Sequence, residues 1–98
     1  MSLLGIARKS GDLLIGSKAS EEAILRRKAK LIILSEDAGN STKRNFSHLA
    51  QKFQIEIMSF PSKESLGALI GFKEAAVIVL TNEDFVESVK KLINSGGE

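Results

Sequence analysis

The 98-residue sequence has no cysteine, tryptophan or tyrosine, and only one histidine and one proline. Without cysteine it can form neither disulfides nor thiolate metal sites, and it has no thiol nucleophile. The single histidine, His48, falls on the polar side of a predicted helix, so we expect its side chain to be exposed. With no second histidine and no cysteine, the sequence offers neither a catalytic triad nor a metal cluster. We therefore expect no enzymatic activity, no cofactor and no metal site.

Export and membrane signals are also missing from the sequence. No apolar run approaches the roughly 20 residues of a membrane span. The charges of the N-terminal segment, Arg8 and Lys9, follow its apolar residues, which is the reverse of a signal peptide. A composition of 43% hydrophobic and 27% charged residues suits one globular domain over residues 1–98. We expect a cytoplasmic protein with no membrane partner.

The charge is unevenly distributed along the chain. Residues 1–52 carry ten Lys or Arg and five Asp or Glu, a net +5, whereas residues 53–98 carry four and seven, a net −3. A basic half is compatible with a nucleic-acid surface. The run 26–30 is either a phosphate contact or a solvated helix end, where cations are favoured. Lys43 and Arg44 lie one turn into a predicted helix, where the helix dipole disfavours cations, and this favours a ligand role.

Hydrophobic periodicity predicts helices that alternate with short strands. We predict helices at 2–10, 17–27, 41–53, 63–70 and 83–94, and strands at 13–15, 31–34, 55–58 and 75–80. The helix caps are expected at Ser17, at Asn40 or Ser41, at Ser62, and at Thr81 or Asn82. This order indicates an α/β sandwich with helices on both faces of a small sheet. The two fully apolar strands, 31–34 and 76–80, should be central.

The stretch from Gly16 to Leu31 begins as a turn, continues as a helix and ends in an apolar strand. Gly16 can adopt backbone angles that are closed to other residues. The free amides at such a helix start can hold an anion or a phosphate. Lys18 stands in this first turn against the helix dipole, which favours a functional role. The alternative is a solvated surface lysine one turn from Glu22.

Three blocks of the sequence resemble the kink-turn RNA-binding ribosomal protein family (L-seven-Ae type), and most of all its bacterial YlxQ-like branch. The stretch 16–31 looks like the signature helix of that family. The run 29–34 is followed by Glu36-Asp37-Ala38, and Ser62-Lys63-x-x-Leu66-Gly67 leads to Gly71 and an apolar strand. The resemblance covers nearly all of the chain. It implies a three-layer α/β/α sandwich with a small mixed four-stranded sheet.

The resemblance also implies a binding mode, in which the Gly16-Ser17 turn and the following helix enter the groove beside tandem sheared G·A pairs. Lys18 occupies the position of an asparagine that reads guanine, and a lysine can still donate there. Ala19 removes a carboxylate that would accept from a base. Glu22 places a negative charge where the family has a positive one, whereas Arg26 matches.

A second contact loop of the family corresponds to residues 70–74. There Phe72 would cap an exposed base and Lys73 would contact a phosphate. The alternative for Phe72 is a position in the hydrophobic core.

We therefore expect a non-enzymatic RNA-binding protein of ribosomal-protein type, acting in a ribosome or translation context. Its partner would be structured, kink-turn-like RNA, with ribosomal RNA among the candidates, and the free protein would be a monomer. The expected RNA contacts are Gly16, Ser17, Lys18, Ala19, Glu22, Arg26, Lys43, Arg44, Phe72 and Lys73. Ala19 and Glu22 motivate the alternative, a protein-interaction module that kept the fold but lost specific RNA recognition.

Overall fold

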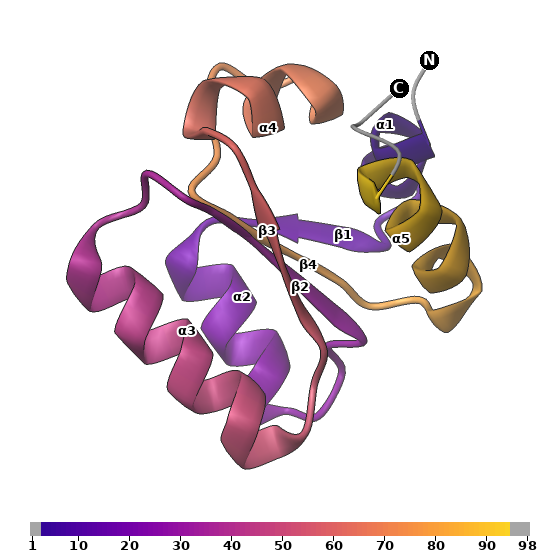
Figure 1. The fold of residues 1–98 in the computed structure, drawn as a ribbon. Coiled ribbons are helices and arrows are strands. Elements are labelled where there is room, and N and C mark those ends of the chain that lie inside the picture. Colours follow the sequence, from indigo (N-terminus) through magenta and orange to yellow (C-terminus); the bar gives the residue numbers. More distant parts are fainter. Residues whose placement is uncertain (1–2, 95–98) are drawn as a thin grey trace.

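A mixed four-stranded sheet forms the centre of the computed structural model, which describes residues 3–94 (Figure 1). The strands are β1 (Leu13–Ile15), β2 (Leu31–Ser35), β3 (Ile57–Phe60) and β4 (Val77–Leu80), in the order β1-β4-β2-β3. β4 runs antiparallel to both of its neighbours, and β2 and β3 are parallel. The central strands β2 and β4 are buried along their whole length, which confirms the prediction from their apolar sequences.

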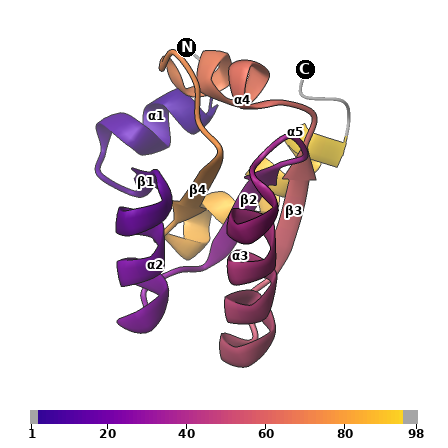
Figure 2. The same cartoon turned by 90° about the vertical axis from the view of Figure 1, so that its left-hand side faces the viewer.

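Helices cover both faces of this sheet (Figures 1 and 2). One face packs against α2 (Ser17–Leu25) and α3 (Asn40–Phe53). The other packs against α1 (Leu3–Lys9), α4 (Lys63–Ile70) and α5 (Val86–Asn94), which follows a 3-10 turn, η1 (Glu83–Phe85). Alternate residues of each strand point to opposite faces, so the sheet separates two hydrophobic cores. The predicted three-layer α/β/α sandwich is confirmed.

Several element boundaries differ from the predictions because backbone hydrogen bonds end or delay the elements. β3 begins two residues later than predicted, since the Ile55 amide still bonds to the Ala50 carbonyl at the end of α3 (2.9 Å). β4 begins at Val77 rather than at residue 75, because the Ala75 amide bonds to the Lys63 carbonyl (3.0 Å). α2 ends at Leu25, and α1 is described only from Leu3, so the predicted start at residue 2 lies outside the described residues.

Two predicted helix caps are present. The Ser62 hydroxyl accepts a hydrogen bond from the Ser65 amide (3.0 Å) at the start of α4. The Asn82 side chain accepts one from the Asp84 amide (2.9 Å) at the start of η1. Each satisfies an amide that the helix itself cannot pair, so the local sequence fixes where these segments begin.

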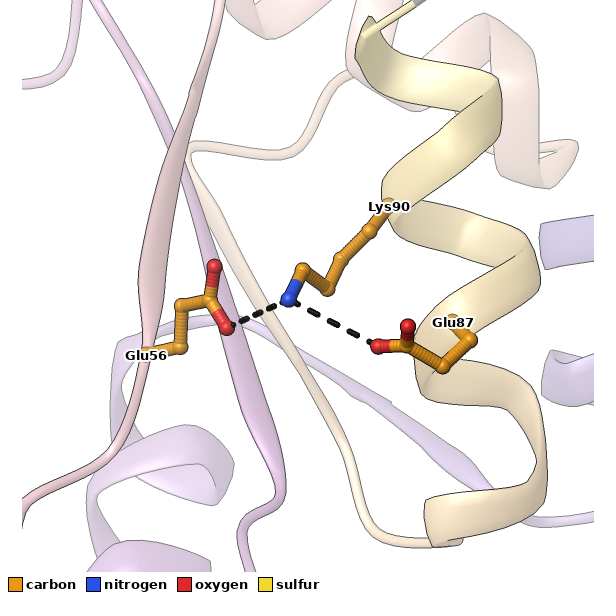
Figure 3. Close-up of polar contacts among 3 residues, drawn as sticks. All are labelled: Glu56, Glu87 and Lys90. Carbon is orange, nitrogen blue, oxygen red and sulfur yellow. Dashed lines mark ion pairs between the residues drawn. The ribbon is translucent and has the colours of Figure 1, made fainter.

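A three-residue ion-pair network ties α5 to the segment that enters the outer strand β3 (Figure 3). Lys90 Nζ lies 2.8 Å from Glu56 Oε1 and 3.6 Å from Glu87 Oε2. The hydrogen bond to Glu56 and the negative charges of both carboxylates raise the pKa of Lys90 above its ordinary value. The network therefore fastens α5 against the sheet for as long as Lys90 is protonated.

Candidate nucleic-acid interface

Four segments that leave or enter the sheet meet at one of its ends. β1, β2 and β3 all finish there, and β4 begins there, because β4 runs opposite to its neighbours. The Ser35 amide bonds to the Ala76 carbonyl (2.8 Å), and the Glu36 amide bonds to the Phe60 carbonyl (2.8 Å). We call this the loop end; its segments are Gly16, 36–39, 61–62 and 71–76. The first turns of α2, α3 and α4 all start from it (Figure 2).

The start of α2 is set by the backbone of Gly16. This residue has φ 96° and ψ 161° and is the N-cap, so the prediction that Ser17 caps the helix is wrong. The Gly16 amide bonds to the Val77 carbonyl (2.9 Å), and its carbonyl accepts from the Ser20 amide (3.0 Å). Ser17 is therefore already the first helical residue, and its side chain is exposed. Among residues 3–94, no side chain caps the first amides of α2, so within that range they remain available to an anion.

α3 begins in the same manner. Its N-cap is Gly39, with φ −59° and ψ 152°, so the prediction of Asn40 or Ser41 is wrong here as well. The Gly39 carbonyl accepts from the Lys43 amide (2.9 Å), which starts the helix one residue earlier than a cap at Asn40 would allow. Two helices on the same face of the sheet thus present their first turns at the loop end without a capping side chain from the described part of the chain.

Two different sides of α2 carry the residues predicted from the family resemblance. Ala19, Glu22 and Arg26 line one groove beside the helix, whereas Lys18 lines another on the far side of Glu22. Glu22 Oε1 lies 3.3 Å from Arg26 Nη2, and both side chains are more than half exposed. An ion pair this exposed contributes little to stability. The ion pair does, however, engage the Arg26 guanidinium, which the family resemblance implies as an RNA contact.

The first turn of α3 supplies Lys43 and Arg44. Lys43 Nζ donates to the Glu36 carbonyl oxygen (3.0 Å), so its charge braces the segment after β2. Arg44 is exposed and has no ion-pair partner among residues 3–94. α3 is fixed to α2 by Asn45, whose Nδ2 donates to Glu21 Oε1 (2.8 Å). No local pattern indicated this contact, because its partners are 24 residues apart.

Phe72 is 46% exposed, so its alternative placement in the core is wrong. The guanidinium carbon of Arg8 lies 4.8 Å from the centre of its ring. Arg8 Nη1 also donates to the carbonyls of Ile70 and Gly71 (3.2 Å each) at the end of α4. Arg8 was not predicted as a site residue; it braces the loop that presents Phe72, and the neighbouring Lys73 is exposed.

The loop end brings together most of the predicted contacts but not all. Gly16, Ser17 and Lys18 lie there next to Val77, the first residue of β4, which the segment of Phe72 and Lys73 leads into. The first turn of α3, with Lys43 and Arg44, starts from the same end. Arg26 lies past the opposite end of α2, about 15 Å away at 1.5 Å per residue. The arrangement therefore offers cations, free amides and one exposed aromatic ring at the loop end, with a further cation at the far end of α2.

Within residues 3–94 the structure also describes the position of His48, possible metal ligands and the length of the helices. His48 is exposed, as predicted. Within that range no group of three or more His, Asp or Glu residues is placed to hold a metal ion. The helices described there include none with the length and apolar character needed to cross a membrane. The loop end itself carries the exposed cations Lys18, Arg44 and Lys73 and the exposed ring of Phe72, together with the exposed carboxylates Glu36, Asp37 and Glu74.

This chain is similar to known proteins over most of its own length and most of theirs. The sequence model of the ribosomal protein L7Ae/L30e/S12e/Gadd45 family matches residues 1–91. The RNA-binding protein YlxQ of Enterococcus faecium is 26% identical over 93 residues, which cover 95% of this chain and 89% of that protein. The YlxQ protein of Bacillus subtilis (strain 168) is 25% identical over 92 residues, which cover 94% and 92%. A solved structure of a protein with unknown function from Bacillus halodurans C superposes with a TM-score of 0.87 and 32% identity, over 94% of this chain and 93% of that one.

Proposed function

This chain belongs to the ribosomal protein L7Ae/L30e/S12e/Gadd45 family, and from that premise we propose that it is a non-enzymatic RNA-binding protein. Its ligand would be structured RNA of the kink-turn type, bound in a ribosome or translation context. The names of the two YlxQ relatives support RNA as the class of ligand. The observation that carries the proposal is that the glycine-capped start of α2 and the loop with the exposed Phe72 and Lys73 lie at the same end of the sheet.

The proposed contacts divide by the chemistry that each residue can supply. Gly16 has no side chain, so an RNA backbone can approach the first amides of α2 closely. Lys18 would donate to a guanine edge, and Phe72 would stack on an unpaired base. Lys73 and Arg44 would contact phosphates, which fix the position of the RNA without reading its sequence.

Glu22 opposes this binding in two ways. Its carboxylate neutralises Arg26 in the free protein, at 3.3 Å, and it adds a negative charge to the groove that the RNA would enter. RNA binding at Arg26 would have to displace Glu22 or tolerate it. We therefore expect Glu22 to lower affinity rather than to provide a contact.

The test uses two variants on the same helix that should act in opposite directions. Lys18→Glu should weaken binding to a short kink-turn RNA roughly 5- to 150-fold, the range for one lost base-edge contact. Glu22→Gln should strengthen binding several-fold, because it frees Arg26 and removes a repulsive charge. Both side chains are exposed, so neither change should lower the melting temperature. Lys91→Glu, on an exposed position of α5, is the matched control.

Binding should be titrated against the intact RNA and against one with its G·A pairs replaced, each at two salt concentrations. Preference for the intact RNA supports kink-turn recognition. Equal, salt-sensitive binding to both RNAs supports a general RNA binder. Affinity that is unchanged in both Lys18→Glu and Glu22→Gln contradicts the proposed face.

The second candidate function is a protein-interaction module, and the outer surface of α2 favours it. Leu25 is 55% exposed and lies in one groove with Lys18 and Glu22, so that side of the helix mixes apolar and charged contacts. Such a surface predicts binding that depends weakly on salt, whereas phosphate contacts predict a steep loss of affinity. Failure to bind either RNA at moderate salt would favour this candidate.

A further inference from the structure

Five basic residues gather at the end of the molecule opposite the loop end. They follow α2 and occupy the last turn of α3, at the lower ends of these helices in Figure 2. All five side chains are exposed. We call them the basic band; its members are Arg26, Arg27, Lys28, Lys30 and Lys52.

Contacts from both sides of α2 arrange the basic band across this end of the molecule. The guanidinium carbon of Arg27 lies 5.3 Å from the centre of the Phe53 ring, and Lys52 Nζ lies 5.8 Å from the same centre. One ring therefore holds two cations from different elements. On the other side, Arg26 and Lys28 line the groove that also contains Ala19. The basic band is thus continuous with the groove along α2.

The positive charge of the basic band exceeds what the fold itself neutralises. Of the five members, only Arg26 has a carboxylate of residues 3–94 within ion-pair distance, that of Glu22. The ends of α2 and α3 contribute about −0.5 elementary charge each, so together they offset about one of the four other cations. Arg27 also has φ 60°, a conformation that glycine adopts with less strain. Helix-end stabilisation therefore explains only part of the cluster.

We propose that the basic band is a second surface for an RNA backbone, which takes up the duplex that continues from an RNA bound at the loop end. This inference rests on the proposed function. Gly16 and Arg26 are about 15 Å apart, so an RNA bound at the loop end would have to extend along α2 to reach the basic band. The groove lined by Arg26 and Lys28 extends along α2 toward the loop end as far as Ala19. The basic band offers cations and only a half-buried aromatic ring, so it would contact phosphates without reading bases.

The test compares a minimal kink-turn RNA with the same RNA whose flanking helices are each extended by about ten base pairs, one helical turn. The variants are Lys30→Gln, Lys52→Gln and their combination, because Arg26 also belongs to the proposed first site. Lys91→Gln is the matched control, since Lys91 is an exposed lysine in the last turn of α5 as Lys52 is in α3. Each protein is titrated at several salt concentrations, after its melting temperature has been compared with that of the wild type.

On the extended RNA, the slope of log affinity against log salt should become shallower by about one for each lysine removed. On the minimal RNA, all variants should bind as the wild type does, and Lys91→Gln should match the wild type on both. If the double variant folds poorly, the single variants give the same comparison.

Three outcomes would overturn the proposal, and they can be told apart. If the wild type and the double variant show equal salt slopes on the extended RNA, the basic band is not a second RNA surface, while the proposed function is unaffected. An equal loss of affinity on both RNAs makes the basic band part of the first site. Failure of the wild type to bind the minimal RNA overturns the proposed function, and the basic band with it.

Discussion

Replacing Gly16 by alanine tests whether backbone geometry fixes the start of α2. Gly16 has φ 96° and ψ 161°, a region of the Ramachandran map that is essentially confined to glycine. A methyl group built on it meets no heavy atom within 4 Å, so steric clash with neighbours does not enter. The cost of Gly16→Ala should therefore be backbone strain alone, about 1–3 kcal/mol in the free energy of unfolding.

Gly39→Ala is the matched control. Gly39 is also a helix N-cap with open space around its Cα, but its φ of −59° is accessible to any residue. Both substitutions lose the preference of an N-cap for glycine over alanine, and both restrict the unfolded chain to the same extent. The difference between the two variants thus isolates the cost of the positive φ at Gly16.

Chemical and thermal denaturation measure this difference. A loss of 1 kcal/mol lowers the melting temperature by about 4–8 °C in a domain of this size. The Gly16→Ala variant should have a clearly lower melting temperature than the Gly39→Ala variant. Its affinity for RNA should fall as well, because the first turn of α2 must shift. Equal stability of the two variants would refute the reasoning that Gly16 is required for its backbone conformation.

Two further predictions concern the packing of α4 and of α5. A methyl group on Gly67 would lie 2.5 Å from the Glu74 Cα. Gly67→Ala should therefore lower the free energy of unfolding by about 1–3 kcal/mol in denaturation experiments. An unchanged free energy of unfolding would mean that segment 71–76 does not pack tightly on α4. The raised pKa of Lys90 means that its interactions, above all with Glu56, stabilise the fold fully below the ordinary value of 10.5, and that this contribution is lost as the pH rises through the raised value. Lys90→Gln should accordingly be less stable than Lys91→Gln at about pH 8, with the gap closing in strongly alkaline buffer; a gap independent of pH would contradict the ion-pair origin.

The proposed RNA-binding surface was only partly predictable from the sequence. Lys18, Arg44 and Lys73 are exposed where the motifs indicated, because each follows a turn or helix start that the local sequence defines. The exposure of Phe72 was left open, since it depends on how segment 71–76 lies on α4 and on the stacking of Arg8 from α1. No local sequence pattern indicated that Arg8 supports this loop, because its contacts span more than 60 residues of sequence.

By itself, the sequence determined the alternation of helices and strands, the burial of β2 and β4, and the cap at Ser62. These features follow from periodicity and from hydrogen bonds between residues a few positions apart, which neighbours along the chain encode. Only the tertiary structure decided the position of Gly16, whose amide bonds to the Val77 carbonyl of β4, and the late start of β4, where the Ala75 amide bonds to the Lys63 carbonyl. It alone also placed Arg27 and Lys52 on one ring. Those features depend on bonds and contacts between separate elements, and such partners are fixed only when the helices pack on the sheet.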